Sequence, residues 1–343
     1  MNSSAGKRRY PPYFLTILGL LVLLLLTLIV SFGLGRYPIS VKELLGILLS
    51  RVFPITPFWD ETMELILFNV RLPRILLACL VGCSLSAAGA AYQGVFQNPM
   101  AAPDILGASH GAAFGAALAI LLALGSRLVT LTAFAMAMLT VLLVWFVSQR
   151  AKGQRVLSLV LSGIMISSLF SACTSFIKLV ADPNDQLPAI TYWLMGSLSG
   201  ARLRDVGLAL IPMALGLAPL FGLRWSINVL TLGDDEARSI GVNARQVRLI
   251  VIICSTLVTA AAVAVSGMIG WVGLVIPHLC RRLVGNNYRE LMPASMLAGA
   301  LFLLIVDNVS RNLLAVEIPI GILTAFVGAP FFVYLITRRG GDL

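Results

Sequence analysis

The stretch Gly107-Ala108-Ser109-His110-Gly111 matches a motif of covalent catalysis. It fits G-x-S-x-G, the turn that presents the nucleophilic serine of many hydrolases, and that chemistry needs a strand before the serine, a helix after it and a separate base. Here the match opens an apolar stretch that continues with Ala112, Gly115 and Ala116, small residues of the kind that let membrane helices pack closely. Helix packing is therefore the favoured interpretation, and an intramembrane enzyme is kept as a third alternative.

Residues able to bind metals or cofactors are scarce. The chain has two histidines and five cysteines, and no C-x-x-C pair. Cys79 and Cys83 lie four residues apart and could meet a metal on one helix face, but small packing residues are the commoner use of such a pair. No G-x-x-x-x-G-K-[ST] phosphate loop occurs. We expect no metal site, no cofactor and no catalytic residue in this chain, and no ATP hydrolysis by the chain itself.

Ionisable residues inside apolar stretches are functional candidates by default because burying a charge in lipid is costly. Only Asp104 and Asp307 qualify, and both lie near the ends of such stretches. Asp307 precedes Arg311 by four residues, the spacing of an ion pair on a helix. A proton-coupled transporter would ordinarily need more carboxylates near the middle of the membrane. Energy is therefore expected to enter from outside this chain.

The elements that position these residues follow from composition. Of 343 residues, 59% are hydrophobic and 12% charged, and the mean hydropathy is +0.94. Soluble domains carry about 25% charged residues, so a soluble globular protein, a disordered chain and a disulfide scaffold are excluded. The net charge of +10 is better explained by basic residues on the cytoplasmic side of a membrane protein than by a nucleic-acid surface. The sequence predicts an all-α, polytopic integral membrane protein in the lipid bilayer.

Stretches free of Asp, Glu, Lys and Arg give the spans, since about 20 apolar helical residues cross a bilayer. The run 249–280 is divided at its glycines, and the run 75–103 is expected to be one long helix from near residue 63 to near Tyr92. This predicts ten spans within one transmembrane domain, 1–343. The charge-free runs are 13–34, 75–103, 105–126, 128–149, 156–177, 206–223, 249–280, 291–306 and 318–337.

Basic tails set the orientation. Lys7, Arg8 and Arg9 flank the first span in the tail 1–12, and Arg338 and Arg339 follow the last. Because basic flanks stay cytoplasmic, both termini are expected on the cytoplasmic side of a bacterial or archaeal inner membrane. Alternating ten spans places fifteen of the 25 basic residues inside and ten outside. The longer outer segments 36–62 and 181–204 are predicted to form interfacial helices and turns.

Three segments could carry function. The inner segment 233–241 reads Gly233, Asp234, Asp235, Glu236, Ala237, Arg238, Ser239, Ile240, Gly241. Acids at its start, an arginine near its end and a closing glycine predict a two-turn helix, either a capped connector or a docking knob for a cytoplasmic partner. Arg71, Arg74 and Arg311 fall at the outer ends of spans. They either reach toward the membrane interface or form a basic rim for an acidic partner.

Hydroxyl residues mark the third segment, the span 156–177. At 100° per residue they share an arc of about 120°, and they should face another helix or a water-filled pathway. Helix packing is the commoner use, so a pathway lining is the minority interpretation. The residues are Ser167, Ser168, Ser171, Thr174 and Ser175.

An ordered set of motifs covers nearly the whole chain. The chain resembles the permease subunits of type II ABC importers for iron–siderophores, haem and cobalamin. Single motifs are weak, but the ordered set is specific. It comprises Arg71-x-Pro73-Arg74, Gly89-x-x-x-Gln93, Asn98-Pro99-Met100-Ala101-x-Pro103-x-x-Leu106-Gly107, Trp193-x-x-Gly196-Ser197, Leu232-Gly233-x-x-x-Ala237-x-x-x-Gly241-Val242, Gly270-x-Val272-Gly273-Leu274-x-x-Pro277-His278-x-x-Arg281, Asp307-x-x-x-Arg311, Pro319-x-Gly321 and Gly328-x-Pro330-x-Phe332.

The resemblance implies a homodimer with a central pathway, two cytoplasmic ATPase subunits that bind Mg-ATP, and one extracytoplasmic substrate-binding protein. It implies that Arg71, Arg74 and Arg311 receive glutamates of the binding protein and that 233–241 is the coupling helix. Asn98, Pro99 and Met100 match the cytoplasmic gate, where the family more often has Leu in place of Met100. His110 lies near the implied pathway and is a candidate substrate contact, whereas His278 belongs to a structural Pro-His stretch.

The sequence leaves the substrate open, because siderophore, haem, cobalamin and oxyanion importers share these motifs. The main alternative function is a secondary transporter or channel driven by an ion gradient. A neighbouring ATPase gene would favour the importer.

Overall fold

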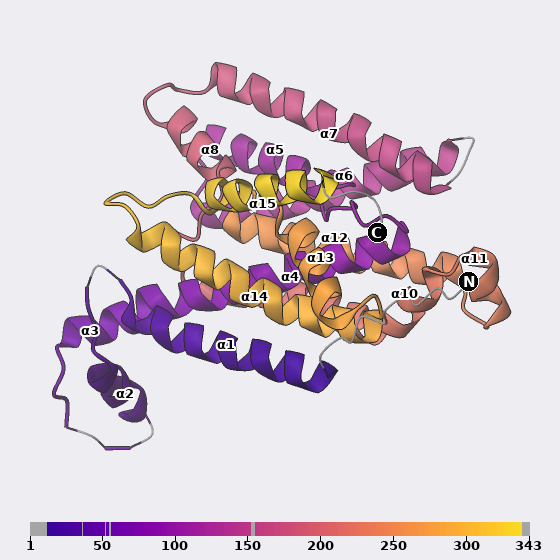
Figure 1. Cartoon of the computed structure of the whole chain (residues 1–343). Helices are drawn as coiled ribbons and strands as arrows, with labels where there is room; N and C mark the ends of the chain where they lie inside the picture. The colour runs from indigo at the N-terminus through magenta and orange to yellow at the C-terminus, as the bar shows by residue number, and fades with distance from the viewer. Residues whose placement is uncertain (1–11, 36, 52, 55, 152–154, 338–343) are drawn as a thin grey trace.

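The computed structural model describes residues 12–35, 37–51, 53–54, 56–151 and 155–337, and every regular element within these ranges is a helix (Figure 1). The expected all-α fold is therefore confirmed. The basic tail residues used to predict the orientation, Lys7 to Arg9 and Arg338 to Arg339, lie outside the described residues.

Within the described ranges, seven helical stretches are long and apolar enough to cross a bilayer. One of them is longer than a usual span, because α3 (Glu61–Ile66), the π-helical turn η1 (Leu67–Arg71) and α4 (Leu72–Val95) follow without a break. This agrees with the single long helix expected from near residue 63. The other six are α1 (Tyr13–Gly33), α6 (Ser126–Arg150), α7 (Arg155–Val180), α9 (Leu203–Gly222), α12 (Ala244–Ser266) and α14 (Tyr288–Asn312).

The remaining three expected spans are α5 (Ala108–Leu121), α13 (Val272–Val284) and α15 (Ile320–Thr337). At 1.5 Å per residue, α5 and α13 are only about 20 Å long, short of the ~30 Å hydrocarbon core. Each begins after a residue with positive φ, Gly107 at 78° and Trp271 at 69°, which no continuing α-helix accommodates. The expected spans 105–126 and 270–284 are therefore half-helices preceded by irregular backbone.

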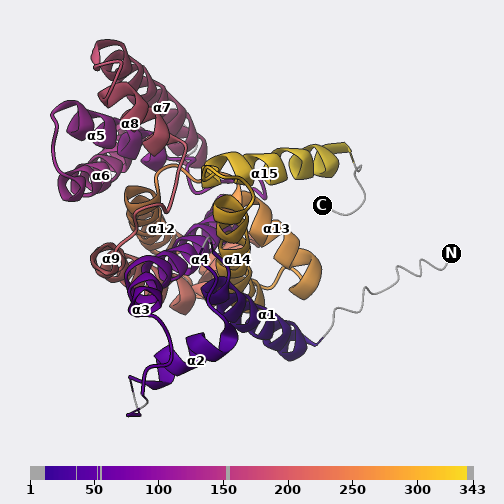
Figure 2. The same cartoon turned by 90° about the vertical axis from the view of Figure 1, so that its left-hand side faces the viewer.

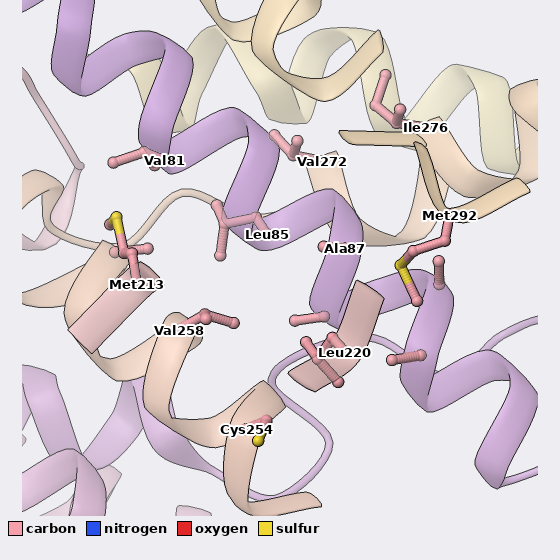
Figure 3. Packing of buried hydrophobic residues seen from close by; sticks show 14 of the residues in the cluster. Val81, Leu85, Ala87, Met213, Leu220, Cys254, Val258, Val272, Ile276 and Met292 are labelled. Atoms are coloured by element: carbon pink, nitrogen blue, oxygen red, sulfur yellow. The ribbon is translucent and has the colours of Figure 1, made fainter. Parts of the chain in front are cut away.

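Helix α4 forms the centre of the bundle. In the most apolar 18-residue stretch of the long helix 61–95, 78% of the residues are buried. Helices α9, α12, α13 and α14 pack around α4 (Figure 2). Figure 3 shows Leu85 of α4 among Met213, Val258 and Val272 from three of these helices. Small residues allow the close approach: a Cβ on Gly89 would lie 1.8 Å from the carbonyl oxygen of Gly273. Helices α5 to α8 gather on one side of the bundle (Figure 2), and the start of α15 lies against the end of α8, where the amide of Gly321 donates to the carbonyl of Met195.

The predicted inner and outer segments lie at opposite ends of the bundle (Figure 1). One end carries α2 (Val41–Leu49) and α8 (Gln186–Leu194), which are the short helices expected in the segments 36–62 and 181–204. The other end carries α10 (Arg224–Leu230) and α11 (Asp234–Ser239). These are called the α2 end and the α11 end below.

Candidate functional site

The three predicted docking arginines converge at the α2 end but are buried. Arg71, Arg74 and Arg311 are 3%, 6% and 8% exposed. Arg74 donates from Nε to Asp307 Oδ1 at 2.8 Å and from Nη1 to both carboxylate oxygens of Glu317 at 2.9 Å. The expected pair on one helix is present, since Arg311 Nε lies 3.8 Å from Asp307 Oδ2. Sequence reasoning missed Glu317, whose separation of 243 residues from Arg74 leaves no local signal.

The other contacts of these arginines explain why they turn inward. Arg71, the last residue of the π-helical turn η1, donates to the carbonyl oxygens of Phe32 and Tyr37. Arg311 donates to the carbonyl oxygen of Ser31 at 2.7 Å. The last carbonyls of a helix have no partner within it and carry partial negative charge. Arg71 and Arg311 thus bind carbonyls at the end of α1 and just after it, whereas Arg74 binds Asp307 and Glu317. Because all three are buried, they are neither a free basic rim nor side chains that reach toward the membrane interface. Their docking role stays a prediction.

The segment 233–241 forms the two-turn helix that the sequence predicts. Gly233 precedes α11 with φ of 128°. The amides of Gly241 and Val242 donate to the carbonyls of Arg238 and Ala237, at 2.9 and 2.8 Å. This pair of bonds is the Schellman motif, which glycine favours because it adopts positive φ without strain. Gly241 has φ of 86°.

Helix α11 is held firmly although it projects from the bundle. Ala237 is fully buried, and Arg248 of α12 donates to both carboxylate oxygens of Asp234, at 2.8 and 3.2 Å. The side chain of Asp235 is 94% exposed, and Leu232 and Ile240 expose 62% and 53% of their surface. The result is an anchored projection with an acidic and apolar outer face. Helix α10, which leads into it, was not predicted from sequence.

The predicted gate residues lie near the α11 end, beside α13 and α15. Asn98, Pro99 and Met100 are exposed in the turn after α4. The Asn98 side chain accepts a hydrogen bond from the amide of Met100 at 2.9 Å. Pro99 and Met100 border a small hollow with His278. A nearby hydrogen bond was not predicted from the sequence: Arg281 Nη1 donates to Oε1 of the buried Gln93 side chain at 2.5 Å.

The predicted hydroxyl stripe of α7 divides between two environments. Ser168, Ser171 and Ser175 are exposed, whereas Thr174 is buried and Ser167 is half-buried. Ser167 lies against Gly107, where a Cβ would come within 2.3 Å of its hydroxyl. Ser167 therefore packs against the start of α5, whereas the three exposed serines face away from the bundle. Whether it lines a pathway stays a prediction.

His110 lies in a cavity of about 480 Å³ between α4, α5, α12 and α15. The cavity is lined by the irregular segments that precede α5 and α13, together with Asp104 and Ser109. Asp104 Oδ1 accepts from the amide of Ser109 at 2.8 Å, and Asp104 Oδ2 lies 3.3 Å from His110 Nδ1. Gly107 leads into α5 from a turn, and no strand precedes Ser109 in the described chain. The hydrolase motif therefore lacks the strand it requires.

Comparison with known proteins decides the family. The model of the FecCD transport family matches residues 23–338. The chain belongs to the FecCD transport family. It is 40% identical over 325 residues to the molybdate import system permease protein MolB of Haemophilus influenzae, covering 94% of this chain and 96% of that protein. It is 39% identical over 293 residues to the hemin transport system permease protein HmuU of Yersinia pestis, covering 82% and 85%.

A solved structure agrees with the fold. The chain superimposes on a metal-chelate type ABC transporter in an inward-facing conformation with a TM-score of 0.84 and 39% identity, covering 94% of this chain and 99% of that one. The FecCD chain described here is thus a membrane-embedded ABC importer permease. The substrates named for the two relatives differ, so family membership leaves the substrate open.

Proposed function

We propose that two copies of this permease form the pathway of an importer for a metal chelate such as an iron–siderophore, haem or a cobalamin. Two ATPase subunits bind Mg-ATP beneath the α11 end, and a substrate-binding protein delivers cargo at the α2 end. The permease is a pathway subunit of the inner membrane and carries out no catalysis itself, and both of its termini are cytoplasmic.

One observation carries this proposal: the anchored projection α11 lies at the end of the bundle opposite α2 and α3 (Figure 1). Arg71, Arg74 and Arg311, called the arginine cluster below, converge at that opposite end. A helix that transmits force must be fixed to the span that moves. The ion pair between Arg248 and Asp234 joins α11 to α12, and the buried Ala237 prevents it from rotating freely. The exposed acids and apolar side chains offer a partner both charge and contact area. ATP-driven closure of the ATPase pair would then tilt α12 and open the pathway alternately to each side.

The contacts of the arginine cluster support the proposed docking of a substrate-binding protein at the α2 end. Arg74 and Arg311 are held by two carboxylates, of which Asp307 is fully buried and Glu317 has 27% of its side chain exposed. Glu317 lies in the connection from α14 to α15, at the surface of the cluster. A glutamate of a binding protein would compete with Glu317 for Arg74. The same cluster would then bind the partner, and release of Glu317 from Arg74 would change the contacts at the start of α15.

The remaining predicted residues complete the pathway. Asn98, Pro99 and Met100 would close it at the α11 end, beside α13 and α15. Ser168, Ser171 and Ser175 on the uncovered face of α7 would line it together with His110.

Reconstitution tests the proposal. In proteoliposomes with the cognate ATPase and binding protein, Glu236→Lys combined with Arg238→Glu should lower uptake per ATP hydrolysed at least ~10-fold, a loss of about 1.4 kcal/mol in coupling. The control reverses the exposed pair Arg51 and Glu64 at the α2 end, and should leave the ratio of uptake to hydrolysis unchanged. Unchanged coupling in the α11 variant, or ATP-independent flux as fast as ATP-driven uptake, would contradict the importer mechanism.

A further inference from the structure

The cavity around His110 is built from interrupted spans. Irregular backbone at membrane depth occurs where it is buried in protein or lines a polar cavity, because lipid cannot satisfy its hydrogen bonds. Both irregular segments meet here: Pro103 precedes α5, and Trp271 precedes α13. The volume of about 480 Å³ lies within the ordinary range of ligand pockets, roughly 300–1,000 Å³.

The carboxylate of Asp104 lies beside the buried edge of the His110 ring. One oxygen of Asp104 is held by the amide of Ser109 at 2.8 Å, and the other faces His110 Nδ1 at 3.3 Å. Nδ1 itself is shielded from solvent, yet 40% of the side chain is exposed. The accessible edge of the ring is therefore the distal one that carries Nε2. Nδ1 makes no hydrogen bond in the described chain, but the carboxylate 3.3 Å away favours the neutral tautomer with its proton on Nδ1, which leaves the lone pair of Nε2 to the cavity.

Other lining groups fit a metal-containing ligand. The hydroxyl of Thr259 borders the cavity, is 1% exposed as a residue, and has no hydrogen-bond partner in the described chain. Met195 and Met268 also line the cavity and offer soft thioether surface. A histidine whose other nitrogen faces a carboxylate is the usual arrangement of a metal ligand, because the carboxylate orients the ring and raises its basicity.

We propose that His110 Nε2 coordinates the metal of the cargo transiently as it passes through this cavity. This rests on the proposed function, in which the cargo is a metal chelate. The ligand class is a chelate with at least one exchangeable coordination position, such as an iron porphyrin or an iron hydroxycarboxylate. A metal–nitrogen bond forms as a metal–water bond breaks, and the reverse exchange releases the cargo. The proton stays on Nδ1 and no electron is transferred.

A spectroscopic titration tests the proposal without ATP or partner proteins. Full-length permease in nanodiscs is titrated with hemin, and imidazole ligation is read from the Soret band and the electron paramagnetic resonance spectrum. The chain has two histidines, so His278→Gln is a matched control. We expect wild type and His278→Gln to show the same ligated spectrum and His110→Gln to lose it. Asp104→Asn should keep the spectrum and weaken hemin affinity about 10- to 100-fold.

Further probes distinguish coordination of the iron by His110 from non-specific binding of the porphyrin and from misfolding of the variants. Metal-free protoporphyrin IX should bind wild type and His110→Gln equally. His110→Met, which keeps a ligand atom in the cavity, should give a thioether-ligated spectrum. An unchanged spectrum in either His110 variant, no ligated spectrum in wild type, or molybdate binding that depends on His110 without a hemin spectrum would overturn the proposal. A ligated spectrum in a permease that fails the ATP-driven uptake assay would instead overturn the proposed function alone.

Discussion

Replacing Asp307 by asparagine removes one negative charge from the centre of the arginine cluster and preserves its shape. Asp307 is fully buried, 2.8 Å from Arg74 Nε and 3.8 Å from Arg311 Nε. An asparagine oxygen can still accept the bond from Arg74. The guanidinium groups cannot lose their charge, because arginine stays protonated in proteins. The variant therefore leaves two buried cations with Glu317 as their only carboxylate within ion-pair distance in the described chain.

Breaking a buried ion pair by removing one partner costs about 3–5 kcal/mol, since the remaining charge stays uncompensated. Because Glu317 still pairs with Arg74 at 2.9 Å, the lower half of that range is expected for Asp307→Asn. Glu317→Gln is the matched control: its side chain is 27% exposed, and partly hydrated pairs contribute about 1 kcal/mol or less.

Equilibrium unfolding in mixed detergent micelles measures the free energy of unfolding of wild type and of each variant. The expected order is wild type, then Glu317→Gln close below it, then Asp307→Asn several kcal/mol lower. If Asp307→Asn were within about 1 kcal/mol of wild type, or if Glu317→Gln cost as much as Asp307→Asn, the cluster would not be held together by its buried charge.

Three further predictions concern packing, docking and the α11 end. Gly89→Ala should destabilise the fold by about 1–3 kcal/mol, because the new Cβ would lie 1.8 Å from a carbonyl oxygen. Gly207 lies inside α9, where a Cβ would have nothing within 4 Å, so in the same unfolding assay Gly207→Ala should stabilise the fold by about 0.5–1 kcal/mol. Glu317→Gln should tighten binding of the substrate-binding protein about 2- to 5-fold, and weaker binding in surface plasmon resonance would contradict competition for Arg74. Arg281→Met should cost about 1–3 kcal/mol by leaving the buried oxygen of Gln93 without its donor, and an unchanged free energy of unfolding in the same unfolding assay would contradict this.

Much of the fold was predictable because its signals are local. Within the described residues, hydropathy located the seven helical stretches long and apolar enough to cross a bilayer and the shorter helices α5, α13 and α15, since each charge-free run is set by neighbouring residues. The acids, arginine and glycine of 233–241 predicted α11 and its cap, because capping bonds join residues at most five apart. Hydropathy did not predict that the spans at 105–126 and 270–284 are half-helices. Their starts depend on positive φ at Gly107 and Trp271, and at Trp271 nothing in the residue type favours it.

The candidate sites were predictable only in part. Position in the chain placed Arg71, Arg74 and Arg311 at one end of the bundle but suggested that they face outward. Their direction depends on the carbonyls at the end of α1 and on Glu317, which approach only when α1, α4 and α14 pack together. The hydroxyl stripe of α7 likewise divides because one edge of it meets α5.

By itself, the sequence predicted an all-helical, multi-span membrane protein with the motifs of an importer permease, a capped two-turn helix at 233–241 and basic residues at the opposite end. Composition, periodicity and caps act over a few residues, so they can be read directly along the chain. Tertiary structure decided which charges pair, and it decided that His110 faces a cavity between two interrupted spans with Asp104 beside its ring. Such features depend on the angles and depths at which distant helices pack, and no local pattern encodes them.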